Sequence, residues 1–227
     1  MIMAIDLHTA LFAQEANPFL SGWAIALYTV LAAVVLSLAF FKKYYIVVGP
    51  DKAIVKSGMG GLDVTTAGGK FIIPLFHRYE FMDLTLKSFE IHREQSEGLI
   101  CQDNIRADIK VAFFIRVDNT QEEMKEVAQS IGARRCSEID TLRELFDAKF
   151  SEALKTVGKQ FDFVDLYDQR DKFKDEILKV IGTDLNGYRL DDAAIDYLEQ
   201  TALEMLSPTN ILDAEGIKKI TELTSNE

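Results

Sequence analysis

The sequence has 227 residues, of which 36 are acidic and 25 are basic, so its formal net charge at pH 7 is −11. An acidic chain of this kind is repelled by polyphosphate, and we therefore expect no nucleic acid among its partners. The charge is unevenly distributed, because residues 1–41 contain no Lys or Arg and only two acids, Asp6 and Glu15. The chain thus has an apolar first part and an acidic remainder.

An uninterrupted apolar segment, GWAIALYTVLAAVVLSLAFF, occupies residues 22–41. As a helix, a segment of this length covers about 30 Å, the thickness of the hydrocarbon core of a bilayer. We interpret it as a transmembrane helix that follows a short non-cytoplasmic tail, residues 1–21. A buried core helix would usually carry a polar stripe, and a cleavable signal peptide would have a basic n-region and a shorter apolar stretch. Neither alternative fits this segment well.

Aromatic and basic residues mark the ends of the segment. Amphipathic rings favour the headgroup layer, and cytoplasmic flanks of membrane helices are rich in Lys and Arg. Because cations follow the segment and none precedes it, we expect the N-terminus outside and the remainder of the chain in the cytoplasm. The residues expected to fix the anchor are Trp23, Tyr28, Phe40, Phe41, Lys42 and Lys43.

Between residues 44 and 118 the pattern changes to short apolar runs of period two, which indicate antiparallel strands. We expect strands at Tyr44–Val48 and Ala53–Lys56, separated by a turn at Gly49-Pro50-Asp51, and longer strands over Phe81–Ile91 and Leu99–Val117. In the last of these, apolar and polar residues alternate, so one face of the sheet is expected to be buried and the other wet. The polar positions are Arg106, Asp108, Lys110 and Arg116.

Residues 119–204 are predicted to be mainly helical. Thr120 and Glu123 have the spacing of a capping box, an amphipathic helix runs from Leu142 to Gly158, and a third helix covers Leu166–Ile181. A closing strand is expected from Tyr188. The predicted fold class is therefore α+β: one N-terminal transmembrane helix, a strand-rich half at residues 44–118, a helix-rich half at residues 119–204, and the start of a long C-terminal coiled-coil helix at residues 208–227.

The last predicted helix has an apolar seam, formed by Ile217, Ile220 and Leu223, without an obvious partner in the chain. A helix of this length is too short to be stable alone. We expect either that the chain is a truncated part of a longer protein or that this helix packs on a neighbouring copy.

No catalytic, cofactor-binding or metal-binding constellation is found, so the protein is not expected to be an enzyme. The three histidines, His8, His77 and His92, do not have metal-ligand spacing, and Gly69-Lys70 lacks the flanking residues of a phosphate-binding loop. Cys101 and Cys136 fit a reducing compartment and are expected to be small buried hydrophobic residues, since acylation has no support in their spacing.

A short apolar stretch, GGKFIIPLF at residues 68–76, leaves two interpretations open. It is too short to cross a bilayer and is broken by Pro74. It is either a core strand or a loop that rests on the membrane, where only apolar contact would hold an acidic chain. The residues of such a loop are Phe71, Ile72, Ile73, Pro74, Leu75 and Phe76.

The order of these segments resembles the SPFH or band 7 superfamily, which includes stomatins, prohibitins, flotillins and the HflK/HflC proteins. The similar motifs are YYIVVGPDKAIVKSG, TAGGKFIIPLFHRYEFMDL and ICQDNIRADIKVAFFIRV after the apolar segment, then IDTLRELFDAKFSEALKTVG, DLYDQRDKFKDEILKVIG and NGYRLDDAAIDYLEQT. The terminal SPTNILDAEGIKKITELT is similar to bacterial flotillin-like proteins of the YqiK type.

The resemblance implies a scaffold anchored in the bacterial inner membrane, a large homo-oligomeric ring or cage that organises a membrane microdomain and encloses other membrane proteins. It implies contact with membrane lipid, no catalytic residues, and a small NfeD-family membrane protein as a partner. We expect side-by-side contacts between copies to use the helices and the terminal seam. The candidate interface residues are Leu142, Leu145, Phe146, Arg170, Phe173, Ile217, Ile220 and Leu223.

Two other functions stay open. One is an HflK/HflC-like regulatory subunit of a membrane protease, which would place the domain on the outer side of the membrane. The other is a sensor or adaptor whose apolar loop responds to lipid state.

Overall fold

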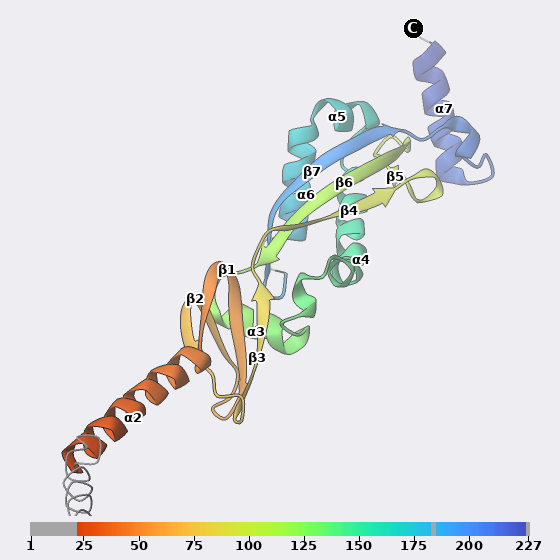
Figure 1. Ribbon diagram of the computed structural model, residues 1–227. Coiled ribbons are helices and arrows are strands. Elements are labelled where there is room, and N and C mark those ends of the chain that lie inside the picture. Colours follow the sequence, from red (N-terminus) through yellow and green to blue (C-terminus); the bar gives the residue numbers. More distant parts are fainter. Residues whose placement is uncertain (1–21, 183–184, 226–227) are drawn as a thin grey trace, which may run out of the picture. The chain divides into compact units, whose positions relative to one another are not determined.

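The computed structural model describes residues 22–182 and 185–225 (Figure 1). The chain divides into two compact units: the first contains the residues up to Val47 together with Gly69–Leu75, and the second contains Val48–Gly68 and the residues from Phe76 onward. The expected tail at residues 1–21 lies outside the described residues. Each unit is considered by itself below.

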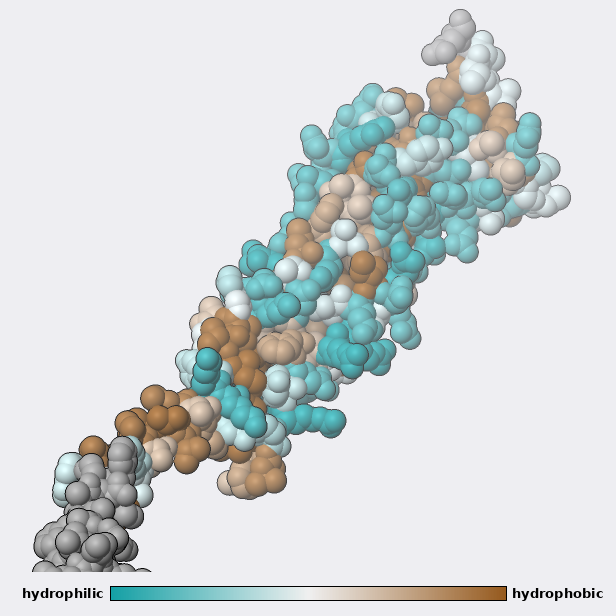
Figure 2. Space-filling view, in the orientation of Figure 1, coloured by the Kyte–Doolittle hydropathy of each residue, from teal (hydrophilic) through white to brown (hydrophobic). Residues whose placement is uncertain are grey.

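The anchor of the first unit is helix α2, Gly22–Tyr44, which is 23 residues long. It continues through Lys42 and Lys43, three residues beyond the predicted end, because lysine is a good helix former. Residues Ile25–Tyr44 have a mean hydropathy of 2.1 and none of this stretch is buried, so its length and composition suit a membrane span. Figure 2 shows apolar residues along the visible face of this helix.

A three-stranded sheet with the order β2-β1-β3 follows, made of β1 (Tyr45–Gly58), β2 (Asp63–Phe71) and β3 (His77–Asp83). The turn predicted at Gly49-Pro50-Asp51 is wrong, because these residues continue β1 as one strand. Pro50 is tolerated there because the antiparallel ladder between β1 and β3 begins only at Lys52, so its missing N–H is not needed in that ladder.

A second, four-stranded sheet is built around β6 (Arg106–Val117), which pairs antiparallel with β4 (Lys87–Arg93), β5 (Leu99–Ile100) and β7 (Tyr188–Gln200). The single strand predicted over Phe81–Ile91 is wrong. Asp83 Oδ1 accepts hydrogen bonds from the backbone N–H and the hydroxyl of Thr85, at 2.9 and 2.7 Å, and this local turn sends β3 and β4 into different sheets.

The strand predicted over Leu99–Val117 is also divided, because residues 101–105 form the connection between β5 and β6. The backbone N–H of Cys101 donates to the carbonyl of Ile105 at 2.9 Å, and Asn104 adopts a positive φ of 64°. The alternation of buried and less buried residues along β6 is as predicted, with one exception. Arg106, expected on the wet face, is only 8% exposed.

The helices of the second unit are α3 (Gln121–Ser130), α4 (Ile139–Gly158), α5 (Phe163–Asp168), α6 (Arg170–Ile181) and α7 (Ile211–Ser225). Thr120 caps α3 as predicted, accepting from the Glu123 N–H at 3.4 Å. The helix predicted over Leu166–Ile181 is interrupted at Gln169, whose ψ of 46° is not helical, and so becomes α5 and α6. Short 3-10 turns lie at Gln95–Glu97, Arg135–Ser137 and Leu203–Met205.

One hydrophobic core joins the second sheet to helices α3, α4, α5 and α6 of the same unit. Phe150 of α4 is fully buried and lies 4.6 Å from Phe113 of β6 and 5.6 Å from Phe89 of β4, measured between ring centroids. Because β7 comes after helices α3 to α6 in the chain and pairs with β6, the predicted strand-rich and helix-rich halves share this core.

Helix α7 packs against its own chain, which corrects the expectation that its seam lacks a partner there. Ile220 is 5% exposed and forms a small core with Ile105 and Leu206, and Ile217 packs at its edge. Leu223 is 42% exposed. Only the first turn of the apolar seam, Ile217 and Ile220, therefore packs against residues of the same chain.

Candidate membrane-contact and assembly sites

An aromatic cluster lies at the C-terminal end of the anchor, within the first unit. The ring of Phe71 lies 5.8 Å from that of Phe40, 5.7 Å from that of Phe41 and 6.3 Å from that of Tyr44. The backbone N–H of Ile72 donates to the carbonyl of Tyr44 at 2.9 Å. Aromatic rings at these separations attract one another beyond simple burial. The cluster therefore ties the apolar stretch to the last turn of α2.

The remaining anchor residues have the exposure that a membrane surface requires. Trp23 and Tyr28 are 71% and 49% exposed near the start of α2, while Lys42 and Lys43 are exposed at its end. The Lys43 ammonium lies 5.8 Å from the centre of the Tyr44 ring. Rings that accompany cations at a helix end suit the boundary between acyl chains and water.

The apolar stretch itself is divided between buried and exposed side chains. Ile72 is 1% exposed, so its assignment to a membrane-resting loop is wrong: its side chain packs within the protein. Pro74 is exposed, and Leu75 and Phe76 are 81% and 51% exposed. A membrane contact by this stretch thus depends on residues 74–76.

Four of the candidate interface residues are buried inside the chain and are unavailable to another copy, because the apolar seams of α4, α6 and α7 face the chain's own sheet and strands. These residues are Leu142, Phe146, Phe173 and Ile220. Leu145 and Leu223 remain exposed, and the Arg170 guanidinium stacks 4.6 Å from the centre of the Tyr167 ring. The sequence pattern identified the amphipathic faces but not the direction in which they point.

The described residues contain no group of three His, Cys, Asp or Glu side chains that could hold a metal ion. His92 lies on the surface beside Glu90 and Glu94, at 3.3 and 3.6 Å, and His8 lies outside the described residues. Both cysteines are free and buried, as predicted. Burial raises the pKa of the Cys101 thiol to about 12, which keeps it protonated and unreactive.

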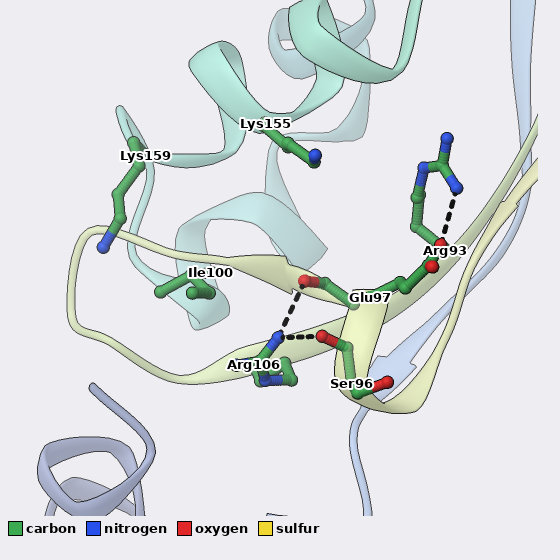
Figure 3. A pocket seen from close by; sticks show the side chains of 8 residues that line it. Arg93, Ser96, Glu97, Ile100, Arg106, Lys155 and Lys159 are labelled. Carbon is green, nitrogen blue, oxygen red and sulfur yellow. Dashed lines mark hydrogen bonds and ion pairs between the residues drawn. The ribbon is translucent and has the colours of Figure 1, made fainter. Parts of the chain in front are cut away.

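Sequence reasoning missed a basic pocket in the second unit, shown in Figure 3. It has a volume of about 700 Å³. Its cations come from three separate parts of the chain, namely β4, the start of β6 and the C-terminal end of α4, so no short sequence motif identifies the pocket. The lining residues are Arg93, Ser96, Glu97, Gly98, Ile100, Arg106, Lys155 and Lys159.

The order of elements, an exposed apolar helix followed by two antiparallel sheets and helices around a shared core, defines a membrane-anchored α+β domain protein. The SPFH domain / Band 7 family matches residues 45–202, and the chain belongs to this family. The chain is similar to the flotillin family inner membrane protein YqiK of Escherichia coli, with 33% identity over 186 residues, which cover 81% of this chain and 34% of that protein.

A second relative is a flotillin family inner membrane protein of Synechocystis sp., 23% identical over 204 residues, which cover 87% of this chain and 30% of the relative. The chain therefore spans about a third of the length of the curated relatives that it matches. Together with the exposed apolar helix, these similarities indicate a flotillin-like membrane protein.

Proposed function

We propose that this protein is a membrane-anchored scaffold that assembles from many copies into a large ring or cage and organises the membrane and the membrane proteins within it. The observation that supports this most directly is the packing of Phe71 against Phe40, Phe41 and Tyr44. These contacts join residues 69–75, which lie within the stretch that the family matches, to the end of the anchor, so this segment would lie at the membrane surface.

The exposed tip of the apolar stretch supports a second membrane contact in each copy. Leu75 and Phe76 are large apolar side chains in a chain with a net charge of −11, which has no electrostatic attraction to anionic lipid. Apolar insertion is the favourable contact that remains to such a protein. Two contacts in each copy, an anchor and a loop, would attach each copy to the membrane more firmly than the anchor alone and so favour assembly within the membrane.

The orientation that we propose follows from the charges at the end of α2. Lys42 and Lys43 lie in its last turn, and the cytoplasmic side of a membrane helix is the one rich in such cations. The Band 7 domain would then be cytoplasmic and the N-terminus outside. A reporter fused after residue 60 that is active only outside the cytoplasm would contradict this and favour the protease-subunit role.

Assembly would make weak contacts between neighbouring domains collectively strong. Copies that share a membrane through identical anchors have a high effective concentration, and a closed ring requires each junction to contribute only a little. The partner that we propose, besides lipid and further copies, is a small NfeD-family membrane protein.

Electron microscopy of the full-length protein, extracted with native lipid, tests the proposed function. We expect closed rings or cages of one diameter, with a small membrane protein in the same fractions. Particles the size of one chain would overturn the scaffold. A lipid sensor without assembly would give the same small particles but change its membrane distribution when Leu75 and Phe76 are replaced by Asp.

A further inference from the structure

The basic pocket contains four cations, of which two are neutralised by carboxylates of the same chain. Arg93 forms ion pairs with Glu97 and Asp147, at 2.9 and 3.1 Å, and Arg106 pairs with Asp213 at 2.7 Å. Arg106 also donates from Nη1 to the carbonyl of Ser96 at 2.8 Å. These two guanidinium groups therefore form the fixed wall of the pocket.

The two lysines of the pocket differ from the arginines. Lys159 Nζ donates to neutral oxygens, the carbonyl of Cys101 at 3.1 Å and the side-chain oxygen of Asn104 at 3.0 Å. Lys155 forms no ion pair within the described part of the chain. Lys155 projects from the last turn of α4 and Lys159 from the residue that follows this helix, on the side of the pocket opposite Arg106 and Ser96 (Figure 3). Two ammonium groups about one helical turn apart thus line the cavity, and neither forms an ion pair with a carboxylate of the described residues.

This arrangement suits carboxylates better than a polyphosphate. The four cations already face three carboxylates, those of Glu97, Asp147 and Asp213, so the excess positive charge is small. Lysines at positions i and i+4 have Cβ atoms about 6 Å apart, which matches two acids at the same spacing on another helix. The apolar side chain of Ile100 offers contact for the aliphatic part of such a segment.

Helix α6 carries a matching acidic pair. Asp171 and Asp175 are exposed, lie four residues apart on one face, and form no ion pair within the residues that the structure describes. Every copy of the chain carries both the lysine pair and the aspartate pair. Copies anchored in one membrane would present them to one another at high effective concentration.

We propose that the pocket lined by Lys155 and Lys159 receives the Asp171–Asp175 face of α6 from a second copy of the chain. This inference rests on the proposed scaffold function and names a contact within it. When the contact runs head to tail, each copy donates one acidic face and accepts another, and repetition around an axis closes a ring.

Charge-reversal variants of the full chain, extracted with native lipid and sized by chromatography and microscopy, test the contact. Lys155→Glu with Lys159→Glu makes the pocket acidic, and Asp171→Lys with Asp175→Lys makes the α6 face basic. Each double variant alone brings like charges together, and we expect the concentration for half-assembly to rise about tenfold or more. The matched control is Lys125→Glu with Lys149→Glu, which changes one lysine of α3 and one of α4, both outside the pocket and outside α6, and is expected to assemble as the wild type does.

Complementation separates a contact from a folding defect. When the two double variants are expressed together, alternating copies pair an acidic pocket with a basic face and a basic pocket with an acidic face, so assembly should return with both variants in equal amounts. A single chain with all four changes should also assemble.

The contact would be overturned if each double variant assembled as the wild type does, or if the mixture failed to restore assembly. It would also be overturned if the Lys155→Glu, Lys159→Glu particles lost anionic lipid while their size stayed the same, because the pocket would then be a site for lipid headgroups. If the wild type itself runs as single chains, the scaffold function fails. If wild-type rings form and the variants also form rings, only the contact fails.

Discussion

Arg106 Nη2 lies 2.7 Å from Asp213 Oδ1 and joins β6 to α7 across 107 positions of the chain. Arg106 Nε donates to the same oxygen at 3.2 Å, and the backbone N–H of Ser207 donates to Asp213 Oδ2 at 3.1 Å. Both charged side chains are 9% exposed. A buried pair with these additional hydrogen bonds orients α7, and removal of either partner would leave the other charge uncompensated.

Replacement of Asp213 by Ala should therefore destabilise the docking of α7 by about 3 kcal/mol, because it leaves the Arg106 guanidinium buried without its carboxylate. Amide hydrogen exchange of residues 211–225 in the detergent-extracted chain measures the effect, and exchange should accelerate there while the amides of β6 stay protected. The control is the double variant Arg106→Met, Asp213→Leu, in which no charge remains and protection should largely return. Unchanged exchange in Asp213→Ala would contradict the role of the pair.

The same pair should make α7 docking sensitive to acid. Burial alone would raise the pKa of Asp213, but hydrogen bonds from Arg106 and from the Ser207 N–H outweigh it and lower this pKa below its usual value. A lowered pKa contributes stability that is fully present above the unfolded value of about 3.9 and is lost as the pH falls through the folded value.

The measurement is hydrogen exchange, or the free energy of unfolding, from pH 7 to pH 2 for the wild type and Asp213→Asn. The stability difference between the wild type and Asp213→Asn should be constant near neutral pH and should shrink below about pH 4. The pKa of Asp83 is also lowered: burial opposes the shift, but hydrogen bonds from Lys87 and Thr85 lower this pKa to about 2, so Asp83 contributes stability over the same direction of pH change. Asp83 is present in both proteins, so its contribution cancels in the comparison. A stability difference that grows in acid would show that the pKa of Asp213 is raised and not lowered in the folded chain.

The elements predicted most accurately from sequence are those whose pattern is long and local. Helix α2 follows from an unbroken apolar segment, and the ends of α3 and α4 follow from Thr120 and Gly158. The predictions failed where local hydrogen bonding or the extent of a strand ladder decides the outcome. The turn at Asp83 divides two strands without a Gly or Pro, and Pro50 does not break β1 because no β3 partner lies beside it.

The candidate site was harder to predict because its parts are distant in sequence. The periodicity of α4 located the apolar face that contains Phe146, but the choice between core and interface depends on the sheet that lies opposite, which only the fold supplies. Likewise, Arg106 occupies a polar position in the alternation of β6 and is buried only because α7 brings Asp213 to it.

Two neighbouring residues of α4 test which side of this helix faces the core. Phe146 is 6% exposed and its ring lies 5.6 Å from Phe150 and 5.3 Å from Tyr188, whereas Leu145 is 44% exposed. Phe146→Ala should lower the free energy of unfolding by about 3–5 kcal/mol because it leaves a cavity in the core. Leu145→Ala should change it by about 0.5 kcal/mol or less, as surface substitutions usually do. Denaturant titration of both variants measures the difference, and equal losses would place Leu145 in the core as well.

The proposed membrane contact of residues 74–76 is testable by fluorescence. With Trp23 replaced by Phe to remove the only native tryptophan, Leu75→Trp should be quenched by lipids brominated on their acyl chains, because residue 75 follows the cluster that ties Phe71 to the anchor. The control is the same Leu75→Trp variant in lipid without bromine, in which the tryptophan fluorescence should remain. Absence of quenching at residue 75 would remove the loop from the membrane and leave the anchor as the proposed contact.

Gly216 should be required for the docking of α7 despite its poor helix propensity. A Cβ atom at this position would lie 2.5 Å from the backbone carbonyl oxygen of Asn104, a distance that side chains do not tolerate and that only a backbone shift could relieve. In an exposed helix Gly→Ala would stabilise by about 1 kcal/mol. Here we expect Gly216→Ala to destabilise by about 1–3 kcal/mol, because the overlap outweighs the propensity. Hydrogen exchange of α7 measures the sign, with Thr221→Ala on the exposed side of the same helix as the control, expected within about 0.5 kcal/mol of the wild type. A slower exchange in Gly216→Ala would show that α7 does not pack closely on Asn104.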